Sequence, residues 1–134
     1  MLTDEVRLDL VRRALDVRQW AYAPYSNYLV GAALLAESGL IYTGVNVENA
    51  AYPTGICAER VAVYKAVSEG EREFLAIAVV TANGGSPCGS CRQVLSEFGL
   101  EIQVILADEQ GAITLETDVA SLLPGAFRPS HLVG

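Results

Sequence analysis

Hydrophobic and polar positions along the chain follow the periods of helices and strands. Apolar residues recur at three- and four-residue steps over positions 4–22, which predicts a first helix with Thr3 as its N-cap. Two apolar runs follow at 29–36 and 40–47, and only Glu37-Ser38-Gly39 separates them. A short polar turn containing glycine between two such runs predicts a β-hairpin.

The second half of the chain alternates between helical and strand-like patterns. The predicted elements are helices over 58–68, 88–98 and 118–123 and strands over 74–81, 102–107 and 112–115. The later strands are almost continuously apolar, which favours a parallel arrangement buried on both faces, whereas the hairpin is antiparallel. We therefore expect an α/β fold with a mixed sheet, and a single domain over residues 1–134 because no linker or repeat interrupts the pattern.

Composition narrows the possible partners. The 134 residues are 51% hydrophobic and 19% charged, which is typical of one globular domain, and no apolar run is long enough to span a membrane. Sixteen acidic residues against nine basic ones give a net charge of −7. Binding to a nucleic-acid polymer requires clustered basic side chains, so we expect a small polar ligand or another protein instead.

The cysteines are the most informative residues. There are three, Cys57, Cys88 and Cys91, and the acidic amino-terminal segment lacks the apolar core of a secretion signal. We therefore expect a cytoplasmic protein with reduced thiols. Under those conditions metal binding or catalysis is favoured over a disulfide framework.

The spacing of the cysteines points to a metal. Cys88 and Cys91 form a Cys-x-x-Cys pair at the start of one predicted helix, and Cys57 stands at the start of another. Helix N-termini carry unpaired N–H groups and partial positive charge, which stabilise the thiolates that zinc binds. Arg60 and Arg92 follow closely and could neutralise a site with three thiolates and one divalent ion.

Other interpretations of these cysteines remain open. A Cys-x-x-Cys pair can be a redox couple or two small buried residues. A structural zinc site takes four protein ligands, and the one histidine, His131, lies in a polar tail where we expect it to be solvated. Three ligands leave one open position, which is the arrangement of catalytic zinc.

The order of these residues matches a known signature. Cys57-Ala58-Glu59 followed by Pro87-Cys88-x-x-Cys91 fits the pattern of zinc deaminases that act on bases, with Cys in place of His. Zinc lowers the pKa of bound water from about 15.7 to about 7 and so supplies hydroxide to attack C4 of the base. Glu59 is the candidate proton shuttle from that water to N3 and to the departing amine.

Over about residues 20–128 the chain resembles the cytidine deaminase family, in its small homotetrameric branch. The segments that carry the resemblance are Tyr25-Ser26, Val30-Gly31-Ala32-Ala33-Leu34, Asn46-Val47-Glu48-Asn49-Ala50-Ala51-Tyr52, Cys57-Ala58-Glu59-Arg60, Pro87-Cys88-Gly89-Ser90-Cys91-Arg92-Gln93 and Leu122-Leu123-Pro124-Gly125-Ala126-Phe127. The resemblance implies a three-layer α-β-α sandwich around a mixed five-stranded sheet, one zinc ion per subunit, and shared active sites in a homotetramer. It also implies hydrolysis of cytidine and 2′-deoxycytidine to the uridine forms, a reaction of pyrimidine salvage.

The resemblance further implies roles for individual residues. Asn46 and Glu48 match a pair that contacts the ribose 3′-hydroxyl, and Ala58 matches a position whose backbone N–H meets the pyrimidine O2. Arg60 matches a residue that hydrogen-bonds the zinc-bound thiolates. Phe127 matches an aromatic residue that reaches a neighbouring subunit's active site.

One position departs from the family pattern. The family usually has Phe-Pro before Val-Gly-Ala, and this chain has Tyr28-Leu29. A tyrosine ring can still stack on the base, but a buried hydroxyl needs a partner. Two alternatives stay open: a deaminase of another aminopyrimidine nucleoside, such as blasticidin S or a modified cytidine, and a catalytically silent zinc-binding assembly subunit. The intact Glu59 and the open fourth position argue against the silent subunit.

Overall fold

A mixed five-stranded sheet forms the centre of the protein. The computed structural model describes residues 2–132. The strands, in the spatial order β2-β1-β3-β4-β5, are β2 (Ile41–Val45), β1 (Gly31–Ala36), β3 (Phe74–Val80), β4 (Gln103–Ala107) and β5 (Ile113–Asp118). Only β3 and β4 run parallel, and the other neighbours are antiparallel. The expectation of a buried parallel arrangement is therefore wrong for the last strand, because β5 is antiparallel to β4 and largely exposed at the edge of the sheet. The expected mixed sheet and the β1–β2 hairpin are therefore confirmed.

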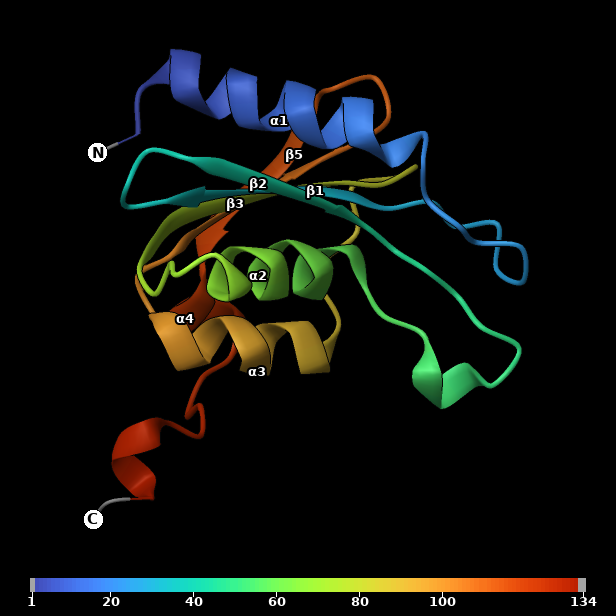
Figure 1. The fold of residues 1–134 in the computed structure, drawn as a ribbon. Helices are drawn as coiled ribbons and strands as arrows, with labels where there is room; N and C mark the ends of the chain where they lie inside the picture. The colour runs from blue at the N-terminus through green and yellow to red at the C-terminus, as the bar shows by residue number, and fades with distance from the viewer. Residues whose placement is uncertain (1, 133–134) are drawn as a thin grey trace.

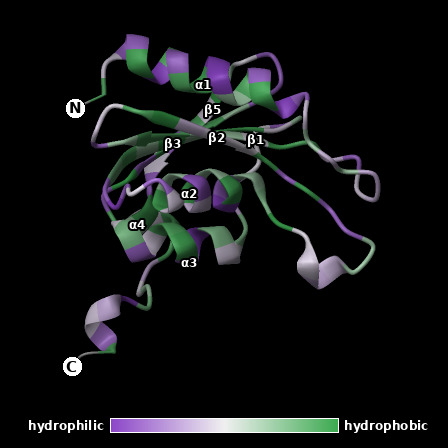
Figure 2. Ribbon diagram, in the orientation of Figure 1, coloured by the Kyte–Doolittle hydropathy of each residue, from purple (hydrophilic) through white to green (hydrophobic). Residues whose placement is uncertain are grey.

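Helices cover both faces of this sheet. Helix α1 (Asp4–Arg18) lies on one face, and α2 (Ala58–Ser68), α3 (Gly89–Phe98) and α4 (Val119–Leu122) lie on the other (Figure 1). Strand β3 lies between the two helical layers and is apolar along its length (Figure 2). Its side chains alternate between two buried clusters, one beneath α1 and one beneath α2. The expected three-layer α-β-α sandwich is confirmed.

The first helix is shorter than its sequence pattern predicts. Thr3 is its N-cap, because the Thr3 side chain accepts a hydrogen bond from the Val6 N–H. The predicted extension to residue 22 is wrong, since α1 ends at Arg18. Beyond it the Tyr22 N–H donates to the Asn46 carbonyl, and the Tyr22 carbonyl accepts from the Glu48 N–H. Pairing with this segment draws the backbone out of the helix and brings residues 46–48 beside the amino-terminal loop.

Two glycines allow the helices to approach the sheet closely. A Cβ atom at Gly31 would lie 2.0 Å from the Ala14 carbonyl oxygen of α1. A Cβ atom at Gly44 would lie 2.5 Å from the Ala58 carbonyl oxygen of α2. Both distances are far below van der Waals contact. The absence of a side chain at Gly44 thus lets the first turn of α2, which follows Cys57, press against the sheet.

The remaining boundaries differ little from the predicted ones. Helix α2 has the predicted bounds, and β5 begins one residue later than predicted and continues to Asp118. The Asp118 side chain accepts a hydrogen bond from the Ser121 N–H, so this residue is the N-cap of α4 rather than its first residue. Two short 3-10 turns complete the described chain, at Tyr52–Thr54 and Pro129–His131. None of the helices in residues 2–132 has the length and apolar character needed to cross a membrane.

Candidate metal and catalytic site

The starts of α2 and α3 bring the three cysteines together. Cys57 is the N-cap of α2, Cys88 is the N-cap of α3, and Cys91 lies in the first turn of α3. Neither N-cap side chain accepts a capping hydrogen bond from its own helix. The thiols therefore face a region where helix N–H groups and helix dipoles favour negative charge.

The spacing of the three sulfur atoms fits a zinc ion. Cys57 Sγ lies 3.7 Å from Cys88 Sγ, which lies 3.5 Å from Cys91 Sγ. All three sulfurs are within 4.8 Å of one another, and all three cysteines are free. Sulfur atoms at tetrahedral positions around zinc, each about 2.3 Å from the ion, are about 3.8 Å apart, whereas a disulfide requires about 2.05 Å. The donor set therefore suits zinc without rearrangement of the backbone.

His131 is not part of this cluster. It lies exposed in the carboxy-terminal 3-10 turn, and its Nδ1 accepts a hydrogen bond from the Arg128 N–H. Within the part of the chain that the structure describes, the metal-ligand cluster consists of the three thiols. A fourth coordination position is thus left for a water molecule or a substrate.

Arg60 supplies the positive charge beside the thiols. Its Nη2 donates to Cys57 Sγ over 3.4 Å. Hydrogen bonding from Cys91 and from Arg60 lowers the pKa of the Cys57 thiol to about 5. The same interaction with Cys57 raises the pKa of Cys91, because the Cys91 thiol keeps the proton that it shares with its neighbour. The hydrogen bonds from Cys91 and Arg60 therefore stabilise Cys57 in its thiolate form.

Arg92 does not act in the way that its position in the sequence suggested. Its Nε donates to the Pro87 carbonyl and its Nη1 donates to the Leu122 carbonyl, each over 2.8 Å. The guanidinium thus holds the loop that leads into Cys88 and ties it to α4. Direct neutralisation of the thiolates falls to Arg60 instead.

Glu59 lies buried next to the cluster. Only 5% of its surface is exposed, yet it lines the same cavity as Cys57 and Cys88. Burial raises the pKa of the Glu59 carboxyl to about 7. A carboxyl group with such a pKa can both accept and release a proton near neutrality, which is the requirement for a proton shuttle.

A cavity of about 640 Å³ opens from the cluster. It brings together most of the candidate residues, although they come from four separate stretches of the chain. Those that line it are Tyr28, Asn46, Glu48, Cys57, Glu59, Arg60 and Cys88. Its volume is within the range of small-molecule sites.

Asn46 and Glu48 contact the loop on one side of this cavity. The buried Asn46 amide accepts from the Val30 N–H and donates to the Tyr28 carbonyl, each over 2.9 Å. The Glu48 carboxylate accepts from the Tyr25 N–H at 3.0 Å, from the Ser26 N–H at 3.1 Å and from the Ser26 hydroxyl. The Ser26 hydrogen bonds lower the pKa of Glu48. Both side chains therefore shape the loop over residues 25–30.

Tyr28 finds the hydrogen-bond partner that its hydroxyl requires. The Tyr28 hydroxyl donates to Asn83 Oδ1 over 2.8 Å. Asn83 falls between the predicted strand over 74–81 and the predicted helix over 88–98, and the sequence offered no signal for this contact because the two residues are 55 positions apart.

Ala58 and Phe127 lie outside the lining of the cavity. Ala58 is fully buried in the first turn of α2, between the lining residues Cys57 and Glu59. Phe127 is 54% exposed, and its ring centroid lies 5.5 Å from that of His131. The segment after α4 leads away from the body of the molecule (Figure 1), so Phe127 does not reach the cavity of its own chain.

The chain matches one family model over most of its length. Residues 4–107 match the cytidine and deoxycytidylate deaminase zinc-binding region. The sequence is 52% identical over 126 residues to a cytidine deaminase of Sporosarcina psychrophila, covering 92% of each chain. It is 49% identical over 121 residues to a cytidine deaminase of Halalkalibacterium halodurans, covering 88% of this chain and 91% of that protein.

A solved structure shows the same fold. The crystal structure of cytidine deaminase from Burkholderia pseudomallei superposes with a TM-score of 0.86 at 44% sequence identity. The match covers 94% of this chain and all of that one. The similarity therefore extends over nearly the whole chain.

Proposed function

The chain belongs to the cytidine and deoxycytidylate deaminase family, and we propose that it hydrolyses cytidine and 2′-deoxycytidine to uridine and 2′-deoxyuridine with one zinc ion per subunit. The observation that carries this proposal is the position of Glu59. This buried carboxyl group lines the same cavity as Cys57 and Cys88, two of the three cysteines whose sulfurs suit zinc.

Cys57, Cys88 and Cys91 would hold the metal, with Arg60 beside the Cys57 sulfur. The chemistry that zinc supplies in such a site is activation of a water molecule at neutral pH. The reaction adds that water to the base: a C4–O bond forms, the C4–N4 bond breaks, and ammonia leaves.

Glu59 moves the protons of this reaction. Its carboxylate accepts a proton from the attacking water and delivers it to ring nitrogen N3, which makes C4 more electrophilic. It then transfers the remaining water proton to the exocyclic nitrogen, so that ammonia rather than the amide anion departs. The burial that raises its pKa also keeps bulk water from competing for these protons.

The polar side chains of the cavity suit a nucleoside. An ionised carboxylate offers about four lone-pair positions, and the loop over residues 25–30 uses three of those on Glu48. The remaining position, together with the second N–H of the Asn46 amide, can bind a ribose hydroxyl. From the first turn of α2, between the lining residues Cys57 and Glu59, Ala58 would offer its backbone N–H to the pyrimidine O2. The Tyr28 ring would stack on the base.

The charge of the cavity favours nucleosides over nucleotides. Among the residues that line it, Arg60 is the single basic side chain, and its guanidinium is already hydrogen-bonded to Cys57. Glu48 and Glu59 contribute acidic groups. A phosphate group would gain no cation there and would be repelled by Glu48, so deoxycytidylate and polynucleotides are disfavoured.

The assembly we propose is a homotetramer with shared active sites. Phe127 is exposed on a segment that leaves its own subunit, and the open cavity offers a place for it in a neighbouring one. Each chain contributes one domain over residues 1–134. The reaction places the protein in pyrimidine salvage, and three reduced cysteines suit the cytoplasm.

Steady-state turnover on a panel of substrates tests this function. We expect the zinc-loaded protein to convert cytidine and 2′-deoxycytidine with far higher kcat/KM than deoxycytidylate, and a chelator to abolish the reaction. Turnover of blasticidin S or a base-modified cytidine without turnover of cytidine would replace the proposed substrate. Failure on the whole panel by fully metallated protein would indicate a silent zinc-binding subunit.

A further inference from the structure

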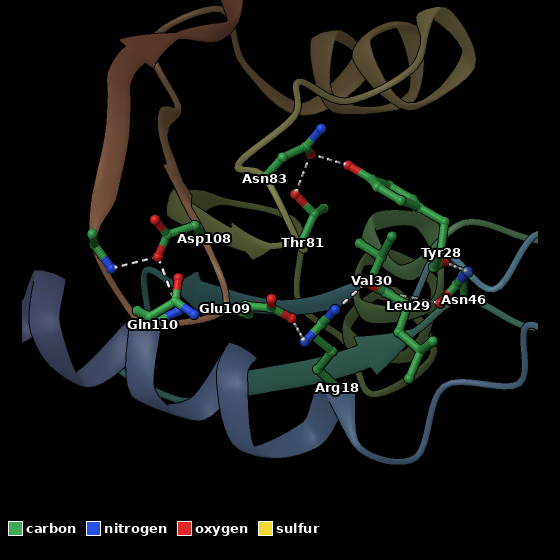
Figure 3. A network of polar contacts seen from close by, with 11 residues as sticks. Arg18, Tyr28, Leu29, Val30, Asn46, Thr81, Asn83, Asp108, Glu109 and Gln110 are labelled. Carbon is green, nitrogen blue, oxygen red and sulfur yellow. Dashed lines mark hydrogen bonds and ion pairs between the residues drawn. The ribbon is translucent and has the colours of Figure 1, made fainter.

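The backbone of the segment Tyr28-Leu29-Val30 is hydrogen-bonded by two side chains from distant parts of the chain, Asn46 and Arg18. Asn46 binds the Tyr28 carbonyl and the Val30 N–H. From the other side, Arg18 Nε donates to the Leu29 carbonyl over 2.9 Å (Figure 3). Hydrogen bonds therefore fix the backbone that carries the Tyr28 side chain at three consecutive residues.

The far end of the Tyr28 side chain is fixed separately, by Asn83. The Asn83 Oδ1 atom accepts the Tyr28 hydroxyl at 2.8 Å and lies 3.4 Å from the Thr81 hydroxyl (Figure 3). Thr81, directly after β3, is 3% exposed and also accepts the Gly85 N–H at 2.9 Å. The Asn83 oxygen thus links the Tyr28 hydroxyl to the Thr81 hydroxyl, and Thr81 in turn binds Gly85 in the loop that leads toward Cys88.

The space around the Tyr28 hydroxyl is closely fitted. A Cβ atom at Gly85 would lie 2.8 Å from that hydroxyl oxygen. Gly85 and Tyr28 both line the cavity. Any side chain at position 85 would displace the hydroxyl or the loop, so this glycine and the Asn83 hydrogen bond define one position of the ring.

We propose that Asn83 is a positioning residue for substrate binding: by accepting the Tyr28 hydroxyl, its side-chain oxygen fixes the Tyr28 ring as a wall of the base pocket. The proposal rests on the proposed function in that the ligand is a pyrimidine nucleoside. Asn83 itself does not line the cavity and acts through Tyr28.

This role predicts an effect on affinity rather than on the chemical step. Without the hydrogen bond the Tyr28 ring is free to rotate, and binding of the base must then order it at a cost in conformational entropy. The positions of Glu59 and the thiols do not change. Loss of one neutral hydrogen bond corresponds to about a three- to tenfold change in an equilibrium constant. We therefore expect Asn83→Ala to raise KM for cytidine, and the dissociation constant of the product uridine, by about three- to tenfold, with kcat within about twofold of wild type.

A double-mutant cycle with Tyr28→Phe separates positioning from a general structural effect. Each single variant should weaken uridine binding in calorimetric titrations, and the double variant should bind no more weakly than the worse single variant, because both remove the same contact. Asn83→Asp keeps an acceptor oxygen and should restore most of the affinity. Gly85→Ala keeps the Tyr28 and Asn83 side chains but displaces the Tyr28 hydroxyl, so it should weaken uridine binding in the same way.

Tyr42→Phe is the matched control. The Tyr42 hydroxyl donates to Glu71 Oε2 over 2.9 Å, away from the cavity, so its removal also costs a tyrosine hydrogen bond, here to a carboxylate, without touching the pocket. Uridine affinity should stay unchanged in this variant. Unchanged uridine affinity in Asn83→Ala, multiplicative losses in the double variant, or a lowered kcat at constant KM would overturn the proposal. Because uridine binding requires no turnover, these results remain distinguishable from an inactive wild-type protein.

Discussion

Cys57 Sγ and Cys88 Sγ lie 3.7 Å apart although the two residues are 31 positions apart in the chain. The contact exists because α2 and α3 start side by side on one face of the sheet, each with a cysteine as its N-cap. Three sulfurs at zinc spacing are thereby built from two helix ends rather than from one compact loop. Metal binding and the packing of these two helices are coupled as a consequence.

Replacement of Cys88 tests this coupling. We expect Cys88→Ala to lose bound zinc and to unfold on the order of 10 °C lower than the zinc-loaded wild type, since it loses both a ligand and the stabilisation that tight binding provides. Metal analysis and thermal unfolding measure the two effects. Ser90→Ala, an exposed change between the two cysteines of α3, should behave like wild type. A stable, fully metallated Cys88→Ala protein would contradict the ligand role.

Arg60 should matter for metal affinity. Its hydrogen bond to Cys57 Sγ stabilises the thiolate form, and loss of such a partner of a metal ligand typically weakens metal binding by about 10- to 100-fold. We expect Arg60→Gln to release zinc to a competing chelator at correspondingly lower chelator concentration. Arg72→Gln is the control, because Arg72 follows α2, the helix that contains Arg60, but donates only to backbone carbonyls. Equal zinc affinity in the two variants would remove Arg60 from the metal site.

Glu48 should make stability depend on pH in the acidic range. Its pKa is lowered in the folded protein, chiefly by the Ser26 hydroxyl, so its contribution is fully present above the ordinary value of 4.5 and is lost as pH falls through the lowered pKa. Glu48→Gln should therefore unfold at lower temperature than wild type at pH 7, and the difference should shrink below pH 4.5. Thermal unfolding of both proteins across this range gives the difference directly, since protonation of the thiolates affects both alike. A difference that grows on acidification would show that the sign is wrong, and Glu97→Gln, on the exposed side of α3, should track wild type throughout.

Phe127 provides a test of shared active sites. If Phe127 of one subunit completes the cavity of another, Phe127→Ala and Glu59→Gln proteins should each be impaired. Mixed oligomers formed by joint refolding should then regain activity, because a subunit with an intact Glu59 can sit beside a partner with an intact Phe127. The measurement is cytidine turnover of the mixture against the average of the two separate samples. No gain, in a mixture shown to contain hybrid oligomers, would indicate that each subunit works alone.

Local features account for the parts of the fold that the sequence predicted well. Helix periodicity and Gly70, two residues beyond Ser68, were sufficient to place α2, and the same approach located the cysteines at helix starts. The end of α1 was missed because it depends on pairing between Tyr22 and residues 46–48, which no local pattern reveals.

The candidate site shows the same division. Spacing alone pointed to the three cysteines and Glu59, since their chemistry depends on short intervals along the chain. The partners of Arg92 and the contact between Tyr28 and Asn83 depend on loops that meet only after folding. Side-chain hydrogen bonds between such distant positions leave no periodic trace in a sequence.

Replacement of one carboxylate oxygen of Glu59 by an amide nitrogen tests the central mechanism most directly. Glu59→Gln keeps the size of the side chain but cannot accept the proton of the attacking water, and general acid–base catalysis contributes about 10²- to 10⁴-fold. Conversion of cytidine to uridine, followed by ultraviolet absorbance, should therefore fall by at least this factor in a Glu59→Gln protein with a full complement of zinc, while Glu97→Gln retains wild-type turnover. Near-normal turnover by zinc-loaded Glu59→Gln would contradict the assignment of Glu59 as the proton shuttle.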